Sequence, residues 1–462
     1  MKKIITQPAP EKISDAELYS LIKDTNVLFT VEEKIHFHTD QDIWPVVSEQ
    51  AAVLLIRSVF ADPVWQPLLS AERVRRLLHS LKGDPDLQKR EDDFVHHDLL
   101  RFPKGVWSIS RGKCVTYDNT LLFSRMVNAD VTQDLPAESP AFHSFCKRVF
   151  SPDKLEQKKM ALYEIIGYCI SDLANIKKAI FLIGPANCGK SVILRFIQRL
   201  VGDENVSNVS LHNFAHRFSV IEMYDKALNI SGEVPSGVLS STSFDVFKAI
   251  TGGDRVNLER KGQQPFYSVV NAKLLFAGNM LPTFAKVDGT DSLVERLHIL
   301  IFDKSVDEDE IDKGMEEKLW AEHDVIVRYA LEQLKYFVIG NKTFTKLDDE
   351  KKLLEEVARM SNPIQHFVES CIEYGNDYYV HISDTYEAYV EFAAGEALPD
   401  INRTAFRNLM ANQTGIKIGK TKRRLGKNSP RACFEGIRLK NLLIDVGQDT
   451  KTSDDEGGIV NE

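Results

Sequence analysis

The sequence predicts an α/β fold built around a phosphate-binding loop. The first observation is the run Gly184-Pro185-Ala186-Asn187-Cys188-Gly189-Lys190-Ser191, which fits the pattern GxxxxGK[ST]. The second is its setting, because an apolar stretch, Ala179 to Ile183, precedes the run and a segment with helical periodicity begins at Val192. The third is the alternation of helical segments and apolar strands from about 150 to 342, which is typical of a mostly parallel sheet.

The residue types of this loop suit a nucleoside triphosphate bound with magnesium. Glycines at both ends let the backbone close around the phosphates, so that its N–H groups point inward. Lys190 is placed to reach the β and γ phosphates, and the Ser191 hydroxyl is placed to hold Mg²⁺. The helix that follows directs the positive end of its dipole at the nucleotide. We therefore expect ATP and Mg²⁺ as cofactors.

The length and composition are those of a protein with several domains. With 462 residues, 43% of them hydrophobic, the chain is long enough for about three domains. It contains no run of about 18 apolar residues, and its N-terminus lacks the apolar stretch of a secretory signal. The six cysteines form no CxxC pair, which argues against a zinc ribbon or a disulfide framework. We expect a cytoplasmic protein with no membrane partner.

Four parts follow one another along the chain. Residues 1–150 predict a mainly α domain, with helices at Glu49–Phe60 and Ala71–Leu81 and a strand-like piece around Gly105–Tyr117. Residues 151–345 are predicted to form the ATPase domain. Residues 346–448 combine a charged connector helix with a small winged-helix domain, and the acidic tail, 449–462, is expected to be disordered.

The winged-helix interpretation rests on the order of the predicted elements. Helical stretches at 364–374, 385–394 and 403–412 are followed by short strand-like pieces around Ile416 and at Phe434–Leu439. Positive charge is concentrated in the same part of the chain.

The whole chain has a net charge of −9, yet the stretch from Arg403 to Lys440 holds eleven basic residues against one acidic residue, a net charge of +10. A dense block of one sign repels itself unless an anion neutralises it, so nucleic acid is the expected partner. A solvated charged face is the alternative interpretation. The residues singled out for DNA contact are Lys422, Arg423 and Arg424.

Two polar residues follow apolar strands downstream of the loop. Glu233 comes after the strand-like run Ala227–Ser231, and an acid at the carboxyl end of a strand can bind Mg²⁺ through water or polarise the attacking water. Asn279 comes after the run Lys273–Gly278, where its amide can orient that water. Ordinary turn chemistry explains the same asparagine without catalysis.

A third polar residue, Arg296, stands directly before the apolar run His298–Phe302. Charge that develops on a transferred phosphoryl group calls for a fixed, forked cation, which a guanidinium provides. Arg296 is therefore a candidate to reach the γ phosphate bound by a neighbouring subunit.

Together these features resemble the motif series of superfamily 3 helicases. The likeness lies in the loop with Asn187 inside it, the strands before Glu233 and Asn279, a hairpin after Gly252-Gly253-Asp254, and Arg296. Within the superfamily, Gly252-Gly253-Asp254 and Asn279-Met280-Leu281-Pro282 resemble motifs of the phage and plasmid primase-helicase family. The stretches 102–106 and 165–168 resemble the helical domain that precedes that family's ATPase. The resemblance covers most of the chain and is most specific from about 160 to 305.

The resemblance implies an AAA+ ring ATPase, usually a hexamer, that threads single-stranded DNA through a pore and moves 3′ to 5′. It implies that Lys190 and Ser191 bind the nucleotide and the metal, and that Glu233 is the acid that binds Mg²⁺ or polarises the attacking water. It further implies that Asn279 is the sensor residue and that Arg296 is an arginine finger supplied to the neighbouring subunit.

It further implies a pore hairpin at Arg255–Phe266, with Arg260 and Lys261 facing the DNA backbone. A solvated hairpin tip explains these two residues without DNA. The chain departs from the pattern at Gly232, where many members of the superfamily have a second acid, and it shows no primase domain.

The sequence thus predicts a replicative DNA helicase of a phage, plasmid or other mobile element. Its expected partners are single-stranded DNA, duplex DNA, further copies of the chain, and a separate primase or other replication proteins. One alternative is an AAA+ initiator or remodelling ATPase that binds duplex DNA without unwinding it. Another is a non-catalytic origin-binding protein whose assembly ATP controls.

Overall fold

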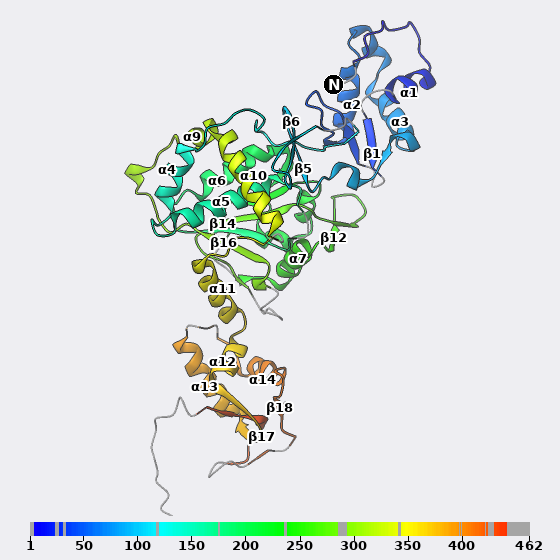
Figure 1. Cartoon of the computed structure of the whole chain (residues 1–462). Coiled ribbons are helices and arrows are strands. Elements are labelled where there is room, and N and C mark those ends of the chain that lie inside the picture. The colour runs from blue at the N-terminus through cyan, green and yellow to red at the C-terminus, as the bar shows by residue number, and fades with distance from the viewer. Residues whose placement is uncertain are drawn as a thin grey trace, which may run out of the picture. The chain divides into compact units, whose positions relative to one another are not determined.

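The chain forms two compact units, each of which is described by itself. The computed structural model describes residues 4–23, 27–30, 34–116, 120–173, 176–234, 238–284, 293–340, 343–396, 398, 400–420, 422–423 and 429–440. The first unit comprises Met1–Ala285 and Asp291–Leu354, and the second comprises Lys286–Thr290 and Glu355–Glu462 (Figure 1). The tail predicted to be disordered, 449–462, lies outside the described residues. None of the described helices is long and apolar enough to cross a bilayer.

The N-terminal part of the first unit combines three helices with two small sheets. The helices are α1 (Asp15–Lys23), α2 (Glu49–Val59) and α3 (Ala71–Leu81), so both predicted helices are present. The first sheet has the order β3-β2-β1-β4 (Val46–Val47, Ile35–Phe37, Val27–Thr30, Gln88–Lys89). The second is the antiparallel meander β5-β6-β7 (Leu99–Phe102, Gly105–Ser108, Lys113–Val115), which contains the predicted strand-like piece. The four-stranded sheet was not predicted, because its strands are only two to four residues long.

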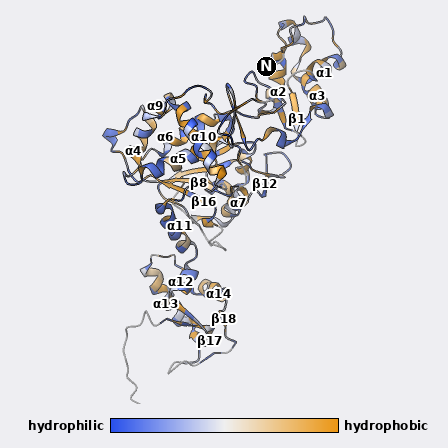
Figure 2. Ribbon diagram, in the orientation of Figure 1, coloured by the Kyte–Doolittle hydropathy of each residue, from blue (hydrophilic) through white to orange (hydrophobic). Residues whose placement is uncertain are grey.

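A parallel five-stranded sheet forms the centre of the first unit and confirms the predicted α/β fold with a P-loop core. Its strands lie in the order β16-β8-β14-β10-β9 (Leu297–Ile301, Ala179–Ile183, Lys273–Gly278, Leu228–Ser231, Val206–Ser207). All four neighbouring pairs are parallel. The strands are buried and strongly apolar, as Figure 2 shows for β8. Their carboxyl ends therefore meet at one edge and their amino ends at the other.

Helices cover this sheet and bury its apolar residues. They are α4 (Pro140–Val149), α5 (Leu155–Ile170), α6 (Lys190–Val201), α7 (Ser241–Gly252), α9 (Met315–Ala321) and α10 (His323–Ile339). α5 packs closely on α10 at Gly167, where a Cβ atom would come within 2.6 Å of the Ala330 carbonyl oxygen. Two further strand pairs lie outside the sheet: β11 with β15 (Val238–Leu239, Thr283–Phe284) and β12 with β13 (Arg255–Leu258, Phe266–Val269). Short 3-10 helices are η1 (Pro63–Leu68), η2 (Pro85–Leu87), η3 (Glu91–Phe94), η4 (Asp203–Asn205), η5 (Leu211–Ala215), η6 (Val220–Met223) and η7 (Glu308–Glu310).

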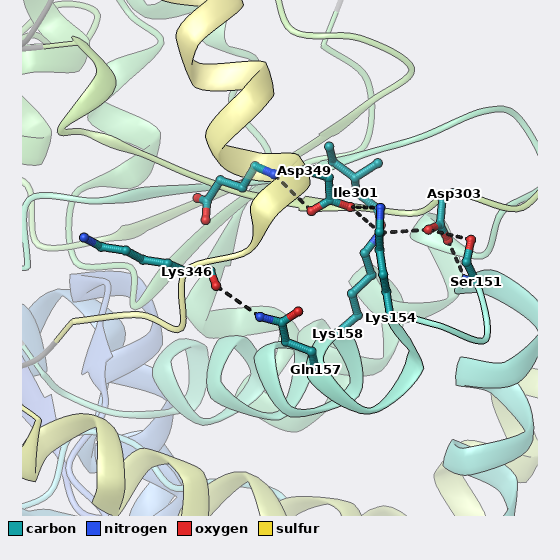
Figure 3. Close-up of polar contacts among 9 residues, drawn as sticks. Ser151, Lys154, Gln157, Lys158, Ile301, Asp303, Lys346 and Asp349 are labelled. Atoms are coloured by element: carbon teal, nitrogen blue, oxygen red, sulfur yellow. Dashed lines mark hydrogen bonds and ion pairs between the residues drawn. The ribbon is translucent and has the colours of Figure 1, made fainter.

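A fully buried lysine joins α5, the end of β16 and the first turn of α11 (Asp348–Ser361). The Nζ atom of Lys158 lies 2.6 Å from the Ile301 carbonyl oxygen, 3.0 Å from the Asp303 carboxylate and 2.7 Å from the Asp349 carboxylate (Figure 3). A buried ammonium is tolerated only when it is paired and hydrogen-bonded: Ile301 and Asp303 accept hydrogen bonds from Lys158, and Asp349 adds a second ion pair. α11 corresponds to the connector helix predicted for residues 346–360, and its first turn is fixed to the sheet.

A second buried pair fixes the same turn to the other half of β16. Nδ1 of His298 lies 2.9 Å from Oε1 of Glu350, and the Ile299 N–H donates to that oxygen over 2.8 Å. Burial by itself raises the pKa of Glu350, but the bonds from His298 and Ile299 outweigh it and hold that pKa below its usual value.

The second unit contains the three helices and the two later strands predicted from the sequence, together with a strand that was not predicted. Its elements are α12 (Pro363–Cys371), β17 (Ile372–His381), α13 (Ile382–Gly395), α14 (Arg403–Ala411), β18 (Lys417–Ile418) and β19 (Cys433–Leu439). The three strands form an antiparallel sheet in the order β17-β19-β18 around a core rich in aromatic rings. The helix predicted over 364–374 ends at Cys371, and the strand after it was not predicted. The pairing of β17 with β19 shifts between Tyr374 and Tyr379, across a Gly-Asn-Asp stretch that hides the strand pattern in the sequence.

Candidate nucleotide-binding site

The phosphate-binding loop connects the carboxyl end of β8 to the first turn of α6. Its backbone is left-handed at Asn187 (φ 57°) and at Gly189 (φ 87°), which caps the helix. A Cβ atom at Gly184 would come within 2.3 Å of the Phe302 carbonyl oxygen, and one at Gly189 within 2.7 Å of the Phe145 ring. Only glycine fits these two positions, which explains physically why the loop begins and nearly ends with glycine. The helix starts at Lys190, two residues before the predicted start.

Lys190 directs its ammonium group back over the loop. Nζ lies 2.7 Å from the carbonyl oxygens of Gly184 and Pro185 and 3.2 Å from Sγ of Cys188. It also lies 3.5 Å from Oδ1 of Asn279. Two of the predicted site residues, one from α6 and one from the end of β14, are thus brought together at the loop.

Glu233 and Asn279 leave the sheet at the same edge. Each follows the carboxyl end of one of two neighbouring parallel strands, β10 and β14. Backbone bonds hold them there: the Val234 N–H donates to the Ala277 carbonyl over 2.9 Å, and the Gly184 N–H donates to the Gly278 carbonyl over 3.2 Å. The Glu233 carboxylate is exposed to solvent, as a residue that meets water or a hydrated cation must be.

The residues available for a metal are few. Ser191 is exposed in the first turn of α6 at the edge where Glu233 lies. Among the described residues, no group of three or more His, Cys, Asp or Glu side chains forms a metal site made of protein alone. One hydroxyl and one carboxylate fit Mg²⁺, which usually takes one or two protein ligands and completes its shell with phosphate and water. Gly232 does not limit the site sterically, because a Cβ there would meet only Leu194, at 3.7 Å.

Arg296 lies at the opposite edge of the sheet. Its carbonyl accepts a hydrogen bond of 2.8 Å from the N–H of Ala179, the first residue of β8, whereas the loop follows the last residue, Ile183. Since a parallel strand rises about 3.3 Å per residue, the Arg296 backbone is roughly 15 to 20 Å from the loop. That distance exceeds the reach of an arginine side chain. The structure therefore places Lys190, Asn279 and Glu233 at the same edge of the sheet, but it does not bring Arg296 to them.

The predicted pore hairpin is formed by β12 and β13, and its second strand runs beyond Phe266 to Val269. At its tip, Lys261 is exposed and the Arg260 guanidinium lies 5.8 Å from the ring centroids of both Tyr224 and Phe266. Reasoning from the sequence missed Arg217, which forms an ion pair with Glu259 of the hairpin. The neighbouring basic and aromatic residues at 217 and 218 were the signal available for it.

The basic residues predicted to contact DNA in the second unit differ in their solvent exposure and in their contacts with other side chains. Lys422 is exposed. Arg423 is half-buried, with its guanidinium 3.7 Å from the Tyr379 ring centroid and 3.9 Å from a Glu435 carboxylate oxygen. Arg424 lies outside the described residues. Two arginines that the prediction did not single out, Arg403 and Arg407, are exposed on α14.

Comparison with known proteins supports the fold rather than a specific activity. Residues 182–296 match the model of a family of unknown function (DUF5906), a stretch that contains every predicted ATPase residue. The A form apo structure of the NrS-1 C-terminal region is similar with a TM-score of 0.52 at 10% identity, covering 92% of this chain and 100% of that one. Another apo structure of the same region is similar with a TM-score of 0.51 at 11% identity, covering 93% and 100%. The likeness is one of fold. No curated protein matches the chain.

Proposed function

We propose that the chain is an ATPase whose catalytic site is completed by a second copy of the same chain. The observation that supports this most directly is the position of Arg296 at one edge of the sheet while Lys190, Glu233 and Asn279 lie at the other. A guanidinium that cannot reach its own loop serves catalysis only if neighbouring subunits place the two edges face to face.

Each residue then has a task that its chemistry allows. The loop N–H groups and Lys190 neutralise the phosphates, and Ser191 and Glu233 hold Mg²⁺, which neutralises further charge when bound. The Asn279 amide and the Glu233 carboxylate orient and polarise the attacking water. Arg296 of the adjacent subunit stabilises the charge that develops on the transferred phosphoryl group. One carboxylate serves both metal and water, because Gly232 supplies no second acid.

We further propose that this ATPase is a DNA helicase of a phage, plasmid or mobile element that moves 3′ to 5′ on single-stranded DNA as a hexameric ring. The resemblance to superfamily 3 helicases supports this, together with a hairpin whose tip exposes Lys261 and the +10 stretch in the second unit. Hydrolysis between subunits would move the hairpin along the strand.

Unwinding of a forked DNA substrate tests the helicase proposal. We expect ATP-dependent release of one strand, hydrolysis that rises when single-stranded DNA is added, and six-membered rings in electron micrographs with an ATP analogue. Hydrolysis without strand release would instead favour the second candidate, an initiator or remodelling ATPase acting on duplex DNA, which the basic stretch of the second unit also supports. Turnover that DNA does not change would favour an origin-binding protein whose assembly ATP controls.

A further inference from the structure

The hairpin β12–β13 has an outer face that differs in chemistry from its inner face. On β12, Arg255 and Asn257 are exposed while Val256 and Leu258 are buried. Tyr267 of β13 is the direct pairing partner of Asn257, and directly opposed residues of an antiparallel pair project from the same face. Arg255, Asn257 and Tyr267 therefore share one solvent-facing surface, called here the outer hairpin face.

Tyr267 is strongly exposed on this face, with 62% of its surface accessible. Its backbone is fixed, since the Arg255 guanidinium donates to the Tyr267 carbonyl oxygen over 2.6 Å. A rigid strand thus holds this aromatic ring at the surface, and tyrosine is enriched at binding surfaces because it offers both an apolar ring and a hydroxyl.

The hairpin is braced from its other side, so the outer face is a firm support. Phe266 meets the Tyr224 ring edge-on, with centroids 5.4 Å apart. At the outer face itself, the Asn257 side chain donates to Glu259 over 3.4 Å, and the ion pair of Glu259 with Arg217 ties the start of the turn to the chain before η6. A ring on such a support can receive a flat ligand without the cost of ordering a loop.

We propose that the outer hairpin face binds single-stranded DNA by stacking, with the Tyr267 ring against a nucleobase and Arg255 beside the adjoining phosphate. The exposed Lys261 at the tip adds a cation for the strand backbone, while the Arg260 guanidinium lies toward the Tyr224 and Phe266 rings on the other side of the hairpin. This inference rests on the proposed function and deepens it, because it makes the grip on the strand depend on bases as well as on phosphates. Stacking accepts every base, which suits a protein that moves along any sequence.

The test separates the contribution of the bases to DNA binding from the contribution of the phosphates. Binding of an oligothymidine strand is compared with binding of an abasic strand of equal length by fluorescence anisotropy, with an ATP analogue at one fixed salt concentration. We expect the native protein to prefer the strand with bases by roughly tenfold. Tyr267→Ala should lose this preference and keep its affinity for the abasic strand, while Tyr267→Phe should retain the preference.

Tyr336→Ala is the matched control, because Tyr336 is equally exposed, at 65%, but lies on α10. It should bind both strands as the native protein does. The inference is overturned if Tyr267→Ala keeps the preference for bases, or if it weakens binding to both strands equally. A native protein that binds both strands with equal affinity overturns the inference alone, whereas one that binds neither strand overturns the proposed function with it.

Discussion

The two edges of the central sheet differ in what surrounds their polar residues. At the carboxyl edge, Glu233 and Ser191 are exposed and Lys190 reaches over an open loop. At the amino edge, charged groups next to Arg296 are buried and paired, as with His298 and Glu350. The carboxyl edge is suited to admit a ligand. The amino edge is suited to hold a side chain in a fixed position, from which it can act on a neighbouring subunit.

Lys273 shows the same contrast within a single strand. It is the first residue of β14, buried at the amino edge, and its ammonium donates to the Ser171 carbonyl. Burial, helped by the nearby Arg125, lowers the pKa of Lys273 to about 7. At the other end of the strand, Gly278 is followed by the solvent-accessible Asn279. Strand β14 therefore has a buried charge at its amino end and an exposed amide after its carboxyl end.

The largest effect is expected from the carboxyl edge. Lys190→Ala removes the cation that the phosphates require, so ATP hydrolysis should fall to background while DNA binding is mostly kept. Hydrolysis is measured by phosphate release, and Lys226→Ala, a lysine outside the loop, is the control. Full hydrolysis by Lys190→Ala would show that the loop is not the catalytic site.

A loss of similar size, but of a different kind, is expected at the amino edge. Arg296→Ala should slow turnover by about a thousandfold and leave nucleotide affinity unchanged, because the guanidinium acts only on the developing charge. Arg199→Ala, which removes one partner of an exposed pair with Glu317, should change neither quantity. A weakened nucleotide affinity in Arg296→Ala with normal turnover would contradict a finger role.

The buried pair of His298 and Glu350 at the amino edge should affect the stability of the protein, and not its turnover alone. Glu350→Gln keeps an acceptor for the Ile299 N–H but loses the charge, and should lower the free energy of unfolding by about 1 to 2 kcal/mol. Because the folded pKa of Glu350 is below its unfolded value, this difference should be full above about pH 4.5 and shrink as pH falls through the folded pKa.

Denaturant unfolding at several pH values measures the Glu350→Gln effect. Glu332→Gln, on an exposed pair with Arg328, is the matched control and should change stability by only a few tenths of a kcal/mol. An equal loss in the two variants would mean that the buried pair adds nothing to the amino edge.

The smallest effect concerns Lys273 and has the opposite sign. Between pH 7 and 10.5 the unfolded chain holds a proton on this lysine that the folded chain releases, so the free energy of unfolding rises with pH. Lys273→Met lacks this slope, so its stability relative to the native protein should be greatest near pH 7 and should fall steadily as the pH rises toward 10.5. Parallel pH profiles of the two proteins would contradict the burial argument.

The sequence indicated where the loop, Glu233 and Asn279 lie in the fold because the signals for these positions are local. A loop with glycines at fixed spacing, and a polar residue directly after an apolar strand, place a side chain without knowledge of distant contacts. The amino edge was predicted only at Arg296, since a charged residue such as Glu350 indicates a surface until its partners from other elements are known, and the same holds for Lys158 beside the carboxyl end of β16. Ile301 follows Lys158 by 143 residues along the chain, and His298 precedes Glu350 by 52 residues.

The remaining differences have the same cause. Arg423 was predicted to contact DNA from charge density, yet Tyr379, on another strand, now covers part of its guanidinium. Tyr267 was overlooked because only the register with Asn257 places it on an exposed face. Strand β17 was missed because its pattern is interrupted by the shift after Tyr374.

Mixing two inactive variants tests most directly whether the two edges meet between subunits. Arg296→Ala has an intact loop and Lys190→Ala has an intact finger, so a mixture forms some interfaces that join the two intact halves. We expect each variant alone to be inactive and the mixture, assembled together with ATP and DNA, to recover a substantial part of native hydrolysis. A mixture as inactive as its components, although the two chains assemble together, would contradict a site shared between copies.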